Sequence, residues 1–227
     1  MITTIIPTLD DEAGLAMTLA ALVPAVTEGI ISEAIVVDAG SKDGTLVVAD
    51  VAGCTVVRGA GGDGLRHAAE LARSEWLLFL APSSVLEANW QGEVLAFLDQ
   101  ALMSGRGRES AAAFRLGRVE AGFRARRAEW LARLRSRLFA APYGDQGLLL
   151  SRAFYRSVGG HRALPAMESV DLSRRIGRRR LTLLHSRAFV RSSSRKAVGF
   201  GAAIRNAACL AVFVLRLPPR LIGRFAA

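Results

Sequence analysis

Residues 35–45 read Ile-Val-Val-Asp-Ala-Gly-Ser-Lys-Asp-Gly-Thr, an apolar run that ends in an aspartate and continues into turn-forming residues. A helical pattern resumes at Thr45. This predicts a buried strand whose last residue, Asp38, presents a carboxylate where open α/β sheets bind ligands. Residues 2–6 predict a second such strand, which runs into the acidic residues 10–12. Two acidic strand ends predict a nucleotide site that reads base and ribose through carboxylates.

Each of these features also has a plainer interpretation. Asp38 would belong to a solvated turn, and residues 10–12 would be a helix N-cap followed by acidic first-turn residues. The occurrence of both, in this order and spacing, favours the functional interpretation. The first strand is not followed by G-x-G-x-x-G, which argues against an ordinary dinucleotide-binding fold.

Strands and helices alternate along the first half of the chain and are less regular in the second. We predict strands at 2–6, 34–38, 54–57, 76–80, 111–117, 148–150 and 181–191, and a glycine-rich loop at 58–64. We predict helices at 12–25, 45–52, 65–74, 85–103, 122–140, 151–158, from 167 onward and at 197–217. This alternation predicts a three-layer α/β/α sandwich with a mostly parallel sheet.

The 227 residues fit one large α/β domain, and no repeat or linker indicates a boundary. Within it we distinguish a nucleotide-binding half at 1–104, an acceptor-side half at 105–195, and a C-terminal apolar and basic helix and tail at 196–227.

The net charge is +10, and all but two of the 30 basic residues are arginines. Codon preference would explain the excess of arginine but not its placement. The first 57 residues are acidic, whereas arginines concentrate at 106–137, 174–195 and 205–224. This asymmetry predicts a basic face towards a phosphate-bearing or membrane-bound partner. No nucleic-acid-binding signature is present, so we do not expect a nucleic-acid partner.

Two further features bear on location. No run reaches the roughly 18 apolar residues of a spanning helix, and the first apolar stretch lacks a preceding basic region. Cys54 and Cys209 lie far apart in apolar surroundings, which indicates reduced thiols in a cytoplasmic protein. The apolar segment 207–225, fringed by arginines, predicts peripheral contact with the inner face of an anionic membrane; packing on the domain or on a second subunit is the alternative.

Four motifs, at residues 5–12, 36–45, 143–147 and 165–175, resemble those of family 2 glycosyltransferases. The chain resembles in particular the small bacterial members labelled arsenosugar-biosynthesis type, over nearly its whole length. The resemblance implies the GT-A fold, a Rossmann-like sheet that binds a nucleotide-sugar such as a UDP- or GDP-sugar. Members of this family typically use a divalent metal, Mg²⁺ or Mn²⁺.

The resemblance assigns roles to individual residues. The base and nucleoside would be contacted by Pro7, Thr8, Asp11 and Asp38. Relatives also have an Arg- and Asn-containing phosphate loop where this chain has residues 61–66, so only Arg58 and Arg66 remain as candidate diphosphate contacts. The acceptor side would be formed by Tyr143, Asp145 and Gln146. The aspartate that aligns with the catalytic base of relatives is missing, and Glu168 or Asp171, on the same predicted helix, would take its place.

The chain departs from the family at the chemistry-bearing positions. Relatives place D-x-D or Phe-Leu-His-Ala-Asp after the fourth strand, whereas residues 79–84 read Phe-Leu-Ala-Pro-Ser-Ser. Since Mg²⁺ and Mn²⁺ prefer carboxylate oxygens, we expect no metal at these residues. The usual Glu-Asp pair of the base reads Glu168-Ser169.

Three functions therefore stay open. The first is a hexosyltransferase that works without a D-x-D metal, with arginines stabilising the leaving group, and it is our main prediction. The second is a degenerate relative that acts as a binding or regulatory protein. The third is a different nucleotide-using transferase.

Overall fold

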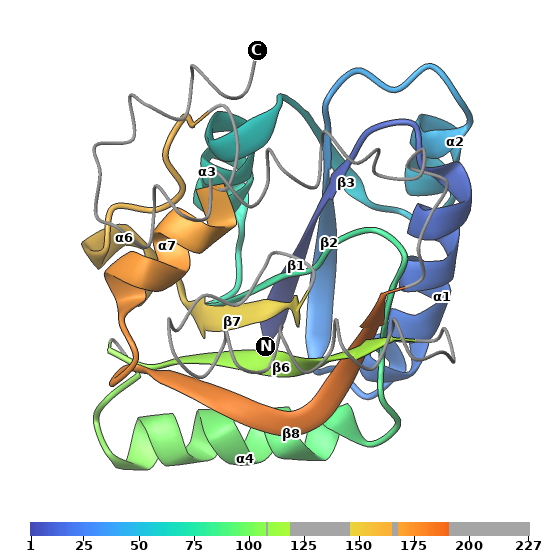
Figure 1. Ribbon diagram of the computed structural model, residues 1–227. Helices are drawn as coiled ribbons and strands as arrows, with labels where there is room; N and C mark the ends of the chain where they lie inside the picture. Colours follow the sequence, from blue (N-terminus) through green and yellow to red (C-terminus); the bar gives the residue numbers. More distant parts are fainter. Residues whose placement is uncertain (108, 119–145, 165–167, 191–227) are drawn as a thin grey trace.

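The computed structural model describes residues 1–107, 109–118, 146–164 and 168–190, which form an eight-stranded sheet with helices against it (Figure 1). The strands are β1 (Ile2–Thr8), β2 (Ile31–Asp38), β3 (Thr55–Arg58), β4 (Trp76–Phe79), β5 (Ser84–Leu86), β6 (Ala111–Arg118), β7 (Leu148–Ser151) and β8 (Leu181–Val190). The helices are α1 (Glu12–Thr27), α2 (Thr45–Val51), α3 (Gly61–Leu71), α4 (Trp90–Met103), α6 (Arg152–Ser157) and α7 (Glu168–Ile176).

The order across the sheet is β3-β2-β1-β4-β7-β6-β8-β5. The pairings among β1, β2, β3 and β4 are parallel, as the alternation of strands and helices predicts. β7 runs antiparallel to both β4 and β6, β6 is parallel to β8, and β5 is antiparallel to β8. The parallel part therefore covers the N-terminal half, and the other half of the sheet is mixed.

The register of the parallel part aligns three strand ends. Thr8 of β1 pairs with Asp38 of β2, and Asp38 pairs with Arg58 of β3. A hydroxyl, a carboxylate and a guanidinium thus occupy neighbouring positions at the carboxyl edge of the sheet.

The core lies on both faces of the sheet. One buried cluster joins Ile2, Ile6 and Val36 to residues of α1, α2 and α4, and the other joins Ile5 and Ile35 to residues of α3, α6 and α7. Strands covered on both faces read as continuous apolar runs, which is the pattern seen in the sequence. The predicted three-layer α/β/α architecture is confirmed.

Two predicted elements are wrong in detail. Residues 58–64 are not a loop throughout, because α3 already begins at Gly61. Its glycines allow close backbone packing: a Cβ on Gly62 would lie 1.9 Å from the carbonyl oxygen of Arg162. Residues 85–103 are not one helix either. Ser84–Leu86 form an edge strand on β8, and α4 begins at Trp90 after Asn89, which has a left-handed φ of 66°.

A carboxylate fixes α4 to β8 where the β6–β8 register shifts. Glu93 of α4 accepts hydrogen bonds from the backbone N–H groups of His185 and Ser186 and from the Ser186 hydroxyl. Burial opposes ionisation, but these hydrogen bonds prevail and lower the pKa of Glu93 to about 2.

Some predictions fall outside the described residues. These are the helices at 122–140 and 197–217, the segment 207–225, Cys209, and the acceptor-side residues Tyr143 and Asp145. Among the helices that the structure describes, none has the length and apolar character needed to cross a membrane.

Candidate active site

The aligned ends of β2 and β3 border a cleft of about 450 Å³. It is lined by Asp38, Ala39, Gly40 and Ser41 after β2, by Arg58, Gly59 and Ala60 after β3, and by Leu46 of α2. The cleft therefore lies at the carboxyl ends of parallel strands, where α/β sheets of this kind bind ligands.

Asp38 is the central acidic group of this cleft. It is 3% exposed, and its carboxylate accepts hydrogen bonds from the backbone N–H groups of Gly40 and Ser41, each at 3.1 Å. Burial would raise the pKa of Asp38, but these hydrogen bonds and the charge of Arg58 outweigh it and lower the pKa below its ordinary value. The carboxylate is thus held ionised and can accept a further hydrogen bond.

Thr8 and Pro7, at the end of β1, lie beside Asp38, the last residue of β2. Thr8 is buried, and its carbonyl accepts a hydrogen bond from the N–H of Ala39 at 3.0 Å. Pro7 is half-buried and pairs with Val37, and it is not among the residues that line the cleft. Of the predicted base pocket, Asp38 therefore faces the cleft and Thr8 supports its turn.

The two arginines predicted to contact the diphosphate lie apart. Arg58 is exposed and lines the Asp38 cleft. Arg66 forms an ion pair with Asp63 at 2.7 Å and lines a second cleft, of about 220 Å³, between α3 and α6. The structure thus brings only Arg58 of this pair next to Asp38.

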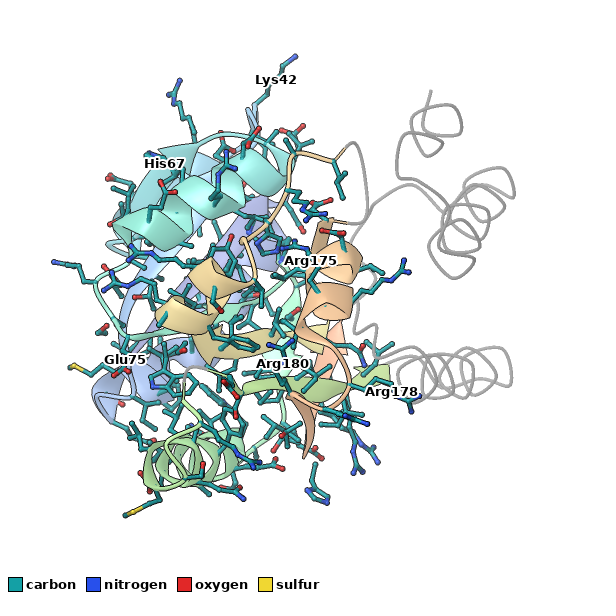
Figure 2. The ribbon with its side chains drawn as sticks, turned by 90° about the vertical axis from the view of Figure 1, so that its left-hand side faces the viewer. Lys42, His67, Glu75, Arg175, Arg178 and Arg180 are labelled. Atoms are coloured by element: carbon teal, nitrogen blue, oxygen red, sulfur yellow. The ribbon has the colours of Figure 1, made fainter. Side chains whose placement is uncertain are left out.

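The acidic run after β1 ties two loops together. The N–H of Lys42 donates to the Asp10 carboxylate at 2.7 Å, and the N–H of Gly44 donates to the Glu12 carboxylate at 3.2 Å. In return the N–H of Glu12 donates to Asp43 at 3.1 Å. These reciprocal bonds fix the loop that follows the Asp38 turn, while Lys42 projects away from the molecule (Figure 2).

Asp11 has structural partners on α1 and at the start of α2. Its carboxylate caps α1 by accepting from the N–H of Gly14 at 3.2 Å, and its own N–H donates to the hydroxyl of Thr45 at 3.1 Å. The plainer interpretation of this residue, a helix N-cap, is confirmed. Its predicted contact with a nucleoside remains a prediction.

The position of the relatives' metal motif is closed. Ser83 is 2% exposed, has a φ of 63°, and donates to the Asp11 carboxylate at 3.4 Å. Ser84 is 1% exposed, and its hydroxyl has no hydrogen-bond partner in the part of the chain that the structure describes. Within the described ranges, no three His, Cys, Asp or Glu side chains form a group that could hold a metal ion. These residues do not fit a divalent metal.

The two candidate bases differ in their surroundings. Glu168 is half-buried in the first turn of α7, and its carboxylate makes no hydrogen bond or ion pair with another described residue. Asp171, one turn later, is buried and forms an ion pair with Arg175 at 2.8 Å. Gln146, the one acceptor-side candidate that the structure describes, is buried just before β7.

Two residues that the sequence analysis did not single out organise the site. Thr45 is fully buried and joins the two acidic loops, and Arg175 holds Asp171. Both roles had a signal in the sequence. The Asp43-Gly44-Thr45 turn before a helix indicates a threonine hydroxyl that takes part in the hydrogen bonds at the helix start, and the spacing of four between Asp171 and Arg175 indicates an ion pair on one helix.

Residues 3–104 match the family model described as "Glycosyl transferase family 2". This segment belongs to glycosyltransferase family 2. It contains the Asp38 cleft, the two acidic loops and the Ala81–Ser84 position. The family prediction is confirmed, whereas the narrower likeness to arsenosugar-biosynthesis members remains a prediction.

Solved glycosyltransferase structures match nearly the whole chain. Glucosyl-3-phosphoglycerate synthase from Mycobacterium tuberculosis in complex with phosphoglyceric acid matches with a TM-score of 0.63 and 20% identity, over 96% of this chain and 81% of that chain. The same synthase in complex with Mn²⁺ and UDP-glucose matches with a TM-score of 0.64 and 20% identity, over 96% and 80%. The GT-A fold is thereby confirmed. No curated protein matches the sequence.

Proposed function

We propose that the protein transfers a sugar from a nucleotide-sugar, a UDP- or GDP-sugar, to an acceptor hydroxyl. The observation that carries the proposal is the cleft in which a buried, ionised Asp38 faces Arg58 at the carboxyl edge of the sheet. Family membership and the UDP-glucose named for a structural neighbour support the donor class.

The two charges suit two parts of such a donor. The Asp38 carboxylate only accepts hydrogen bonds, so it favours a base with a ring N–H, as uracil and guanine have. The Arg58 guanidinium matches phosphate oxygens and stabilises the diphosphate as it leaves with the electrons of the glycosidic bond. Glu168 takes the proton of the acceptor hydroxyl, whose oxygen attacks the anomeric carbon.

In this proposal the transfer does not use a metal held at residues 81–84, because two buried serines supply no anionic ligand. The same observation supports a second candidate function. A chain that lost its metal ligands while keeping the nucleotide cleft would serve as a nucleotide-sugar-binding or regulatory protein.

Calorimetric titration with UDP and with GDP, each with and without Mn²⁺, tests the donor and the metal together. We expect one of them to bind without Mn²⁺, with an affinity that Mn²⁺ leaves largely unchanged. Asp38→Asn should weaken that binding roughly 10- to 100-fold, because it removes a charged hydrogen-bond acceptor.

Asp50→Asn, at an exposed position of α2, is the matched control and should bind like the parent chain. If neither nucleotide bound with or without Mn²⁺, the proposed donor would be wrong. If binding required Mn²⁺, the metal-free proposal would be wrong. Binding without turnover of any sugar nucleotide would favour the second candidate function.

We further propose that the protein acts at the cytoplasmic face of a membrane on a lipid-linked acceptor. The support is in the sequence: the apolar segment 207–225 carries arginines that would face anionic headgroups, each contributing about 1 kcal/mol near such a surface. Packing of this segment on the domain or on a second subunit is the competing explanation.

Liposome flotation of the full chain and of a chain truncated after Arg205 distinguishes these explanations. We expect the full chain to float with vesicles that contain anionic lipid and the truncated chain to stay at the bottom. Neutral vesicles are the control for the charge contribution. Failure of both chains to float on anionic vesicles would contradict membrane contact.

A further inference from the structure

Asp171 is engaged in a buried ion-pair network. Its carboxylate oxygen Oδ2 accepts from Nε of Arg175 at 2.8 Å and lies 2.8 Å from Nη2 of the same guanidinium. The side chains of Asp171 and Arg175 are only 11% and 16% exposed. Oδ1 lies 3.8 Å from the guanidinium of Arg162, so both carboxylate oxygens face cations.

The other end of this network is the segment 158–164. The Arg175 guanidinium donates to the carbonyl of Val158 and, at 2.6 Å, to the carbonyl of Gly160. Figure 2 shows Arg175 on α7, beside the segment that follows α6. One guanidinium, from the last turn of α7, therefore joins this helix to the chain that precedes it.

Segment 158–164 is packed on two further sides. The N–H of His161 and its Nδ1 both lie 2.9 Å from the Tyr155 hydroxyl, and the His161 ring packs edge-on against Phe79 at the end of β4. The carbonyl of Arg162 packs on Gly62 of α3. Segment 158–164 thus connects the end of β4, the first turn of α3 and α7.

We propose that Asp171 is a positioning residue, not the proton acceptor: through Arg175 it holds segment 158–164 against α7, the helix whose first turn carries Glu168. The proposal rests on the proposed function for the role of Glu168. Its structural part is the clamp, by which we mean the Asp171–Arg175 ion pair together with the hydrogen bonds from Arg175 to Val158 and Gly160. The clamp does not depend on whether the protein is catalytically active. Both oxygens of the Asp171 carboxylate already lie next to guanidinium groups, which occupy the positions where an acceptor hydroxyl would have to bind, whereas the Glu168 carboxylate makes no competing interaction with the described residues.

Hydrogen exchange tests the clamp without any assay of turnover. In Asp171→Asn, the amides of Gly160, His161 and Leu164 should exchange roughly tenfold faster or more, because Arg175 loses its charged partner. Arg175→Lys should show the same increase, since an ammonium cannot reproduce the forked donors. Asp99→Asn, the same chemical change at an exposed position of α4, is the matched control and should leave these amides unchanged.

The pH dependence of turnover tests the assignment of the base. Asp171→Asn should lower kcat but keep the limb of the pH profile that reports the base, whereas Glu168→Gln should remove that limb. Unchanged exchange in both Asp171→Asn and Arg175→Lys would overturn the clamp. Loss of the limb in Asp171→Asn, with retention in Glu168→Gln, would overturn the assignment of Glu168 as the base.

If Asp171→Asn did not fold, the hydrogen exchange of Arg175→Lys would decide whether the clamp exists. If the parent chain transferred no sugar, the proposed function would fail while the exchange result still decided the clamp.

Discussion

Glu168→Gln is expected to lower kcat for sugar transfer roughly 10²- to 10⁴-fold, because the amide cannot take the proton of the acceptor hydroxyl. The affinity for the nucleotide should change little, since α7 is not among the elements that line the Asp38 cleft. The measurement is steady-state turnover with the sugar nucleotide selected by titration, together with calorimetric binding of the corresponding nucleoside diphosphate.

Glu75→Gln makes the same chemical change on an exposed side chain at the amino-terminal end of β4 and should turn over like the parent chain (Figure 2). An unchanged kcat in Glu168→Gln would mean that this glutamate only stabilises the N-terminal turn of α7 by facing the helix dipole. A parallel loss of nucleotide affinity would instead indicate that the substitution disturbs the whole site.

Gly62→Ala is expected to lower the free energy of unfolding by about 1–3 kcal/mol. In most helices this substitution stabilises, because glycine is a poor helix former. At Gly62 a Cβ would lie 1.9 Å from the carbonyl oxygen of Arg162 and 2.5 Å from its carbonyl carbon. Both atoms are backbone, so α3 and segment 158–164 must separate. Urea-induced unfolding, followed by far-ultraviolet circular dichroism, measures the loss.

Gly92→Ala, on α4, is the matched control, because apart from the adjacent backbone of its own helix a Cβ there would meet no atom within 4 Å. It should raise the free energy of unfolding by roughly 0.5–1 kcal/mol. A stabilisation of similar size in Gly62→Ala would contradict the close packing of α3 on segment 158–164. If the nucleotide affinity also fell in Gly62→Ala, the shift of α3 would have reached the adjoining Arg58–Ala60 side of the cleft.

The candidate site was only partly predictable, because some of its residues are placed by local sequence patterns and others by contacts between segments that are distant in the sequence. Asp38 was predictable: an apolar run that ends in an aspartate and a turn is a local pattern, and the buried strand follows from it. Arg58 and Arg66 looked equivalent in the sequence. The structure places one at the end of β3 and the other on the surface of α3, beside a second cleft.

The sequence by itself determined the parallel N-terminal half, the layered α/β architecture and the family, because these depend on hydrophobic period, turn residues and short motifs. Tertiary structure alone decided the register that aligns Thr8, Asp38 and Arg58, and the packing that made the run from Gly59 to Gly64 partly helical. It also separated Asp171 from Glu168, since Arg175 binds one carboxylate and not the other. The physical reason is that local patterns fix backbone conformation, whereas the partner of a charged side chain is chosen when distant segments pack together.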